Sequence, residues 1–146
     1  MKAISLWQPW ASLWCTSRKV HETRHWCCSH RGWLLVHAAK RFEIDFALDV
    51  RLRLILDDEF GRYWARDLPT GALIGMVNVS DCQPTQMLFG DAAASDDDRE
   101  CGDFTPGRFA WKRDEFRLFD QPVPYRGRQG IFSVPDELIP EVGLWA

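Results

Sequence analysis

Residues 17–26 of the chain are Ser17-Arg18-Lys19-Val20-His21-Glu22-Thr23-Arg24-His25-Trp26. The part from residue 20 to residue 26 reads as a β-strand, in which alternate side chains share a face. Glu22, Arg24 and Trp26 therefore lie on one face. A carboxylate and a guanidinium on a buried face need each other or a ligand, because unpaired buried charges are strongly disfavoured. The stretch therefore predicts either a structural ion pair or a polar pocket.

The composition is that of a folded globular protein. Of the 146 residues, 46% are hydrophobic and 27% are charged, which argues against an intrinsically disordered chain. A chain of this length can bury a core of its own, so we expect a single domain over residues 1–146. Eight tryptophans are many for this length. Tryptophan serves both cores and base-stacking surfaces, and we expect most of them in the core.

The charge is unevenly distributed along the chain. The net charge of −3 argues against a protein that coats DNA unspecifically. Residues 16–41, however, carry six cations, one acid and all four histidines, so this segment has a net charge of +5 and the remainder −8. Such asymmetry is compatible with an anionic ligand, and equally with a solvated basic face.

The five cysteines are expected to be reduced thiols in a cytoplasmic protein. The chain starts without an apolar signal segment and has no apolar run of membrane-spanning length, so we expect no membrane partner. The cluster Cys27-Cys28-Ser29-His30 invites a zinc hypothesis. Adjacent cysteines lack the C-x-x-C spacing of a structural zinc site, so we expect no metal and no cofactor.

The pattern of apolar residues predicts several strands and few helices. Strands are expected at residues 3–6, 20–26, 33–39, 72–82, 109–113, 116–119 and 125–134. Helices are expected over residues 8–14 and 43–64, the second broken at Gly61. The apolar stripe of the second helix contains Ala47, Leu48, Val50, Leu52, Leu54 and Ile55.

Three local features qualify this pattern. Gly75 inside the strand at residues 72–82 indicates a bulge or a close backbone approach. His37 inside the strand at residues 33–39 is expected to be a core histidine with satisfied hydrogen bonds. Residues 83–108 contain an acidic, small-residue tract, and we expect a long mobile loop there. Several expected strands with only a few helices predict an α+β fold, namely a small and partly closed β-barrel with helical insertions.

Several motifs together resemble the ASCH domain family, which belongs to the PUA-like superfamily. The match runs from Met1 to about Val134 and rests on Ser5-Leu6-Trp7-Gln8-Pro9-Trp10-Ala11-Ser12-Leu13, Lys19-x-x-Glu22-x-Arg24-x-Trp26, Arg31-Gly32, His37-Ala38-Ala39-Lys40, Ala72-Leu73-Ile74-Gly75-Met76-Val77, Phe109-Ala110-Trp111 and Pro122-Val123-Pro124…Gly127…Gln129-Gly130. The resemblance implies a PUA-like small β-barrel with peripheral helices and a cleft lined by the Lys19-to-Arg24 segment. It also implies a nucleic-acid ligand, RNA above all; one such domain belongs to a transcription coactivator.

Some relatives in the family are enzymes, and the sequence departs from them at a decisive position. They include amidohydrolases that deacetylate N4-acetylcytidine, and ribonucleases. In the amidohydrolases a Thr three residues after the Lys is thought to be the nucleophile, whereas this chain has Glu22 there. Thr23 would point to the opposite strand face. The family also has Gly two residues before the lysine, where this chain has Ser17.

Two functional hypotheses and one structural alternative follow. In the first, the domain binds single-stranded RNA or a modified nucleotide, and Glu22 accepts a hydrogen bond from an exocyclic amine. Phosphates would be met by Lys19, Arg24, Lys40 and Arg41, and a base would stack on Trp26 or Trp111.

In the second hypothesis the protein is a hydrolase that acts on an N-acylated nucleoside or on an RNA phosphodiester. Lys19 and Glu22 are then the catalytic pair, and Arg24 orients the substrate or stabilises charge. His21, His25 and His37 are candidate proton shuttles. In the third reading Lys19, Glu22 and Arg24 form an ion-pair network that has no ligand. Whether the protein is an enzyme stays open at this point.

Overall fold

The fold is a single mixed sheet that curves around a short helix. The computed structural model describes residues 1–42 and 49–141. The sheet has the strand order β2-β5-β4-β3-β1-β6, and within it only β1 and β3 are parallel neighbours. The strands are β1 (Lys2–Leu6), β2 (His21–Arg24), β3 (Gly32–Ala38), β4 (Ala72–Pro84), β5 (Phe109–Pro124) and β6 (Ile131–Ser133).

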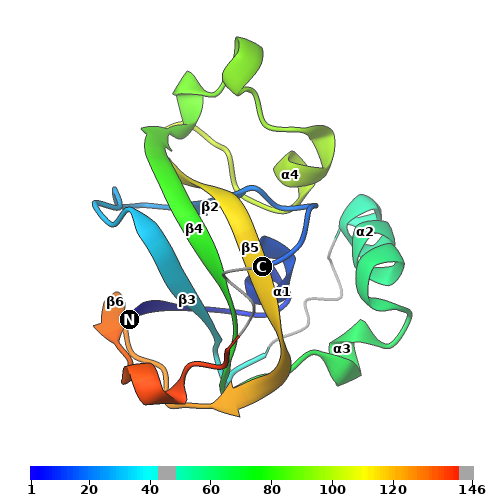
Figure 1. Ribbon diagram of the computed structural model, residues 1–146. Helices are drawn as coiled ribbons and strands as arrows, with labels where there is room; N and C mark the ends of the chain where they lie inside the picture. The colour runs from blue at the N-terminus through cyan, green and yellow to red at the C-terminus, as the bar shows by residue number, and fades with distance from the viewer. Residues whose placement is uncertain (43–48, 142–146) are drawn as a thin grey trace.

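The long strands β4 and β5 bend the sheet into a half-barrel (Figure 1). β2 and β6 are the two edges, and within the described residues no ladder joins them to close the barrel. The expected partly closed barrel with helices is therefore confirmed. Two separate strands were expected at residues 109–113 and 116–119, but β5 runs through both, and only its pairing with β4 shifts register between Arg113 and Phe116.

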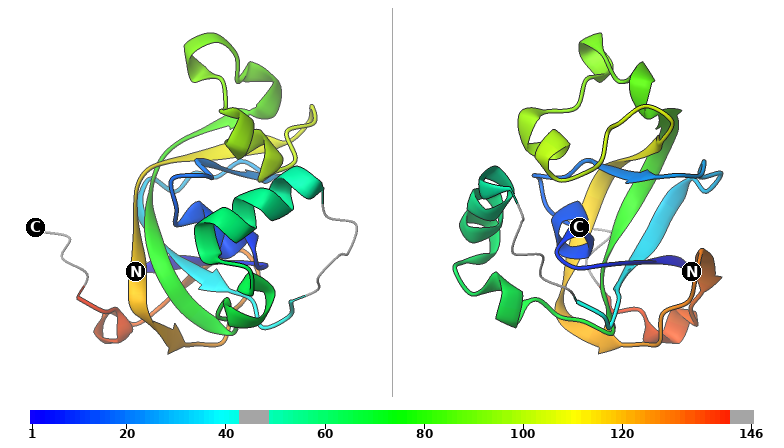
Figure 2. Two further views of the ribbon diagram at one scale, coloured as in Figure 1. Left: turned by 90° about the vertical axis from the view of Figure 1, so that its right-hand side faces the viewer. Right: turned by 180° about the vertical axis from the view of Figure 1, so that it is seen from behind.

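The helices occupy the inside and one side of this half-barrel (Figure 2). They are α1 (Trp10–Trp14), α2 (Val50–Phe60), α3 (Trp64–Asp67) and α4 (Asp96–Glu100), with 3-10 turns at Thr85–Met87, Gly90–Ala92 and Asp136–Leu138. α1 lies within the curve of the sheet, where Trp14 belongs to a core cluster with Leu34, Val36 and Trp111. α2 and α3 cover the outer side of α1 through a second cluster that includes Leu13.

The central strand β3 is buried on both faces. Leu34 and Val36 face α1, whereas the alternate residue Leu35 packs with Phe132 in a cluster on the other side of the sheet. This two-sided burial explains the nearly continuous apolar run, because a strand covered on both faces does not need a polar side.

The prediction for the second helix is partly confirmed. Leu52 and Ile55 are buried, but Val50 and Leu54 are 71% and 63% exposed, because α2 contacts the core with a narrower face than the predicted stripe. The helix ends at Gly61, whose φ of +86° favours glycine. Residues 43–48, including the rest of the predicted stripe, lie outside the described residues.

The bulge predicted at Gly75 is confirmed. The pairing of β4 with β5 shifts register between Leu73 and Gly75. A Cβ atom on Gly75 would collide with the backbone oxygen of Arg117, so glycine allows the two strands to approach closely here.

Residues 83–108 contain more regular secondary structure than the predicted loop. They contain two 3-10 turns and α4, which is capped by the Ser95 side chain. The carboxylate of Asp98, expected to be solvated with the rest of the acidic tract, is instead fully buried. It accepts hydrogen bonds from the amides of Val20 (2.8 Å) and His21 (3.0 Å) and lies 2.6 Å from His21 Nδ1. The mobility of the remaining segment stays a prediction.

We expect Asp98→Asn to destabilise the fold by about 2–4 kcal/mol, because it weakens three hydrogen bonds to a buried group. Burial raises the pKa of Asp98, but the hydrogen bonds from His21 and Val20 outweigh burial, and the pKa lies below the ordinary 3.8. The stabilisation is therefore present above pH 3.8 and is lost as the pH falls through the lower folded pKa. Urea unfolding of both proteins near neutral pH and in acid measures the effect.

The exposed neighbour Asp96 provides the matched control. Asp96→Asn should change the free energy of unfolding by no more than about 0.5 kcal/mol. Equal stability of the Asp98 and Asp96 variants would contradict the structural role assigned to Asp98.

Candidate functional site

A groove of about 1050 Å³ lies where the ends of β1, β2 and β3 meet the connection from β5 to β6. The chain therefore supplies its lining from five separated segments. The lining residues are Ser5, Trp7, Arg24, His25, Trp26, His37, Ala39, Lys40, Gly71, Tyr125, Arg126, Gly127, Arg128, Gln129 and Gly130.

The lining is cationic and aromatic. Arg24, Lys40, Arg126 and Arg128 contribute four positive charges, and among the described residues that line the groove there is no Asp or Glu. This absence is notable in a chain with 21 acids and 18 lysines and arginines. Field lines from several like charges add in a concave site, so the groove attracts anions although the whole protein is negative.

Three aromatic residues border the same space. They are Trp7, Trp26 and Tyr125, of which Trp7 is 51% exposed. An exposed indole beside cations offers a flat apolar surface for stacking. The guanidinium of Arg41 lies 5.9 Å from the Trp7 ring, which places this predicted phosphate contact near the groove but outside its lining.

His37 forms part of the groove wall and is held by hydrogen bonds at both ring nitrogens. Its Nε2 lies 2.7 Å from the backbone oxygen of Tyr125, and its Nδ1 lies 2.9 Å from Ser5 Oγ. Burial lowers the pKa of His37. The neutral ring donates from Nε2, because a carbonyl can only accept, and Nδ1 accepts from the Ser5 hydroxyl. This confirms the expected satisfied core histidine and leaves neither nitrogen free to shuttle a proton.

Gly127 allows the connection between β5 and β6 to close over His37. A Cβ atom at this position would lie 2.6 Å from Cε1 of His37 and 3.0 Å from Ser5 Oγ. Any larger residue would push the loop that carries Arg126 and Arg128 away from the sheet.

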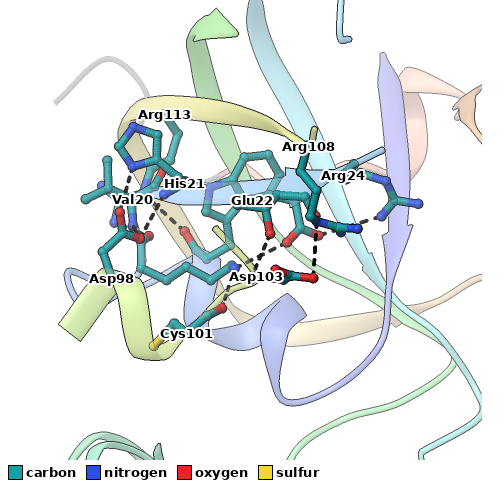
Figure 3. A network of polar contacts seen from close by, with 12 residues as sticks. Val20, His21, Glu22, Arg24, Asp98, Cys101, Asp103, Arg108 and Arg113 are labelled. Atoms are coloured by element: carbon teal, nitrogen blue, oxygen red, sulfur yellow. Dashed lines mark hydrogen bonds and ion pairs between the residues drawn. The ribbon is translucent and has the colours of Figure 1, made fainter. Parts of the chain in front are cut away.

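Lys19, Glu22 and Arg24 form a chain of ion pairs that leads from the buried Lys19 to Arg24. Figure 3 shows Glu22 and Arg24 within the surrounding network of polar contacts. Lys19 Nζ lies 3.2 Å from Glu22 Oε1, and Glu22 Oε2 lies 3.6 Å from Arg24 Nη1. Of the two alternatives that the sequence left open for this strand face, the structure thus has the ion pair between Glu22 and Arg24. Only Arg24 lines the groove.

The expected contact of Lys19 with a ligand phosphate is not supported. Its side chain is fully buried, and Nζ donates a 2.7 Å hydrogen bond to the backbone oxygen of Cys101. The side chain of Glu22 is only 10% exposed and is engaged by the two cations. Glu22 therefore positions Arg24, and Lys19 joins the start of β2 to the segment after α4.

Trp111 likewise lies behind the groove and does not line it. It is fully buried, and its Nε1 donates to the backbone oxygen of Trp26 at 3.2 Å. The rings of Trp26 and Trp111 meet edge to face at 4.6 Å, with the Arg24 guanidinium 5.9 Å from each. Trp111 therefore supports the groove wall, whereas Trp26 forms it.

The residues that sequence reasoning missed come mostly from the far end of the chain. Arg126, Arg128 and Tyr125 lie about 100 positions from Arg24 in the sequence, and nothing local connects them. The available signal was the pair of glycines, Gly127 and Gly130, around two polar residues. It indicated a tight surface turn, but not which residues the turn faces.

Metal-ligand clusters and membrane-spanning helices are both absent from the described part of the chain. In residues 1–42 and 49–141 no group of three or more His, Cys, Asp and Glu side chains could hold a metal ion. Over the same residues, no helix has the length and apolar character needed to cross a membrane.

Comparison with known proteins agrees with this architecture. A crystal structure of ASCH from Zymomonas mobilis matches with a TM-score of 0.54 at 13% identity, covering 94% of this chain and 89% of that one. Crystal structures of two mutants of that bacterial protein match with TM-scores of 0.54 and 0.52 at the same identity, covering 94% of this chain and 91% and 89% of theirs. This likeness confirms the expected α+β, PUA-like fold.

Sequence comparison identifies the family. Human (Homo sapiens) activating signal cointegrator 1 is 37% identical over 84 residues, which cover 54% of this chain but only 14% of the human protein. The model of the ASCH domain matches residues 4–104, well over half of the chain. The protein therefore belongs to the ASCH domain family.

Proposed function

We propose that the groove binds single-stranded RNA or a modified nucleotide of RNA. The observation that carries this proposal is the meeting of four cations and three aromatic residues in one groove, with no carboxylate among the lining residues that the structure describes. Cations meet phosphates, and aromatic faces stack on unpaired bases, so this combination matches a single strand. Membership of the ASCH family supports the same ligand class.

The geometry suggests which groups meet which part of the strand. Lys40, Arg126 and Arg128 are exposed at the groove and can follow a phosphate backbone. Trp7 and Trp26 are in reach of a base within the same groove. Arg24 is held by Glu22 and lies against two indole rings, so its guanidinium is positioned before a ligand arrives.

The hydrolase hypothesis is not favoured by any specific observation. Its catalytic amine, Lys19, is enclosed and hydrogen-bonded to Cys101, and Glu22 is engaged by two cations. Catalysis through this pair would first require the buried ion pair to open, at a cost of several kcal/mol. We therefore propose a binding function only.

Removing groove cations should weaken RNA binding and reduce its dependence on salt. For the double variant Arg126→Ala and Arg128→Ala we expect a loss of roughly tenfold or more at low salt. The slope of log affinity against log salt should fall by about 0.7 for each lost phosphate contact. Fluorescence anisotropy with a labelled single-stranded RNA at several salt concentrations measures both quantities.

The control for this experiment removes the same charge elsewhere. Arg62 is exposed between α2 and α3 and does not line the groove, so Arg62→Ala should leave affinity and slope nearly unchanged. Absence of RNA binding at low salt would refute the proposal, as would an equal loss in the Arg62 variant.

Stacking on Trp7 should contribute measurably to the same affinity. Trp7→Ala is expected to cost about 1–3 kcal/mol of binding free energy, and Trp7→Phe should recover part of it because a smaller aromatic face remains. The same anisotropy titration compares the variants. Wild-type affinity in Trp7→Ala would show that a base does not stack there.

Lys19→Met should separate the role of the buried ion pair from that of the groove. Because this change leaves Glu22 buried without its ammonium partner, we expect a loss of about 3–5 kcal/mol in the free energy of unfolding. At a temperature where the variant is still folded, its RNA affinity should equal that of wild type. A loss of affinity as large as that of the Arg126 and Arg128 double variant would instead place Lys19 in contact with the ligand.

A further inference from the structure

Two cysteines that are far apart in the sequence meet beside the groove. Cys27 lies in the connection from β2 to β3 and is exposed, whereas Cys82 lies in β4 and is partly buried. Their sulfur atoms are 3.6 Å apart, in contact as free thiols. Fifty-five positions separate them in the chain, so the tertiary fold alone creates this pair.

We propose that Cys27 and Cys82 are an oxidation site, at which a peroxide converts the two thiols into an intramolecular disulfide. Sulfur atoms in van der Waals contact need only a side-chain rotation to reach bonding distance. The position of Cys82 is further fixed, because the amide of Cys28 donates a hydrogen bond to its sulfur at 3.3 Å.

The surroundings of the two sulfurs assign the order of the steps. Cys27 is exposed, so its thiolate can reach a peroxide in solvent and attack the O–O bond. This step gives a sulfenic acid on Cys27 and reduces one peroxide oxygen to water. Burial raises the pKa of the Cys82 thiol to about 11, which disfavours Cys82 as the first nucleophile.

In the second step the sulfur of Cys82 attacks the sulfur of the Cys27 sulfenic acid. The S–S bond forms, the S–O bond breaks, and the departing hydroxide takes the Cys82 proton to become a second water. In total two thiols lose two hydrogen atoms and one hydrogen peroxide is reduced to two waters.

The other three cysteines are buried and therefore serve as internal controls for the oxidation. Cys28 is buried and its thiol contacts the backbone oxygen of His30, at 3.8 Å. Cys15 and Cys101 are buried as well, and burial raises the pKa of their thiols to about 12 and about 11. These thiols are shielded from a peroxide that reaches Cys27.

The disulfide would act on the groove wall. Cys27 directly follows Trp26, whose backbone oxygen is already held by Trp111, and Cys82 pairs with Trp111 in the sheet. A bond between Cys27 and Cys82 would therefore tie the Trp26 segment to β4. The proposed chemistry depends only on the two thiols and is independent of what the groove binds.

The test uses the full chain, reduced and then freed of reductant. The folded protein is treated with hydrogen peroxide, its remaining thiols are alkylated, and peptide mapping by mass spectrometry locates the bond. We expect a monomer that has lost two hydrogen atoms through a peptide cross-link between Cys27 and Cys82, and whose midpoint of thermal unfolding is raised. Treatment with dithiothreitol should restore both the mass and the midpoint.

Substitutions distinguish this pair from general thiol oxidation. Cys27→Ser and Cys82→Ser should each abolish the internal cross-link, whereas Cys28→Ser and Cys101→Ser should keep it. Three outcomes would overturn the proposal: a bond between the adjacent Cys27 and Cys28, a disulfide-linked dimer as the main product, or Cys27 oxidised to sulfinic acid while Cys82 stays reduced.

Discussion

The free edge of β2 is the constraint on which much of this structure depends. Among the described strands β2 pairs with β5 alone, so its other backbone edge must find partners elsewhere. The segment from α4 to β5 supplies them. Asp98 accepts from the amides of Val20 and His21, and Arg108 donates to the backbone oxygen of Thr23 at 3.0 Å. An acidic stretch thereby becomes a structural cover for the strand that carries the candidate site.

Buried cations complete the same arrangement from the inside. Arg113, only 5% exposed, donates to the backbone oxygens of Trp14, Thr16 and Lys19. These carbonyls belong to the end of α1 and the connection that follows it, where helix geometry leaves acceptors without partners. Together with the bond from Lys19 to Cys101, they hold the start of β2 in place. Glu22 and Arg24 follow on this strand, and their ion pair holds Arg24 at the groove.

The distribution of charge over the molecule depends on which acidic side chains are buried or form ion pairs. Asp98 and Glu22 are engaged in the interior, and the carboxylates of Asp58, Glu59 and Asp97 surround Arg18, between α2 and α4. The groove lining has four cations and, in residues 1–42 and 49–141, no acid of its own. A protein with a net negative charge can thus present a local positive surface, because many of its acidic side chains are engaged away from the groove.

The sequence by itself determined the α+β class, because its apolar pattern predicted several strands and few helices. It also placed Glu22 and Arg24 on one strand face, since a period of two brings alternate side chains to the same face. Residue type and the family motifs placed Lys19 and Trp111 among the candidate ligand contacts, but both are buried, and a sequence pattern does not report depth in the fold. Only the tertiary structure decided that Arg126 and Arg128 face Arg24 and Lys40, and that Cys27 touches Cys82. These contacts join segments up to about 100 positions apart, and they arise from sheet order and strand curvature, which no local stretch of sequence encodes.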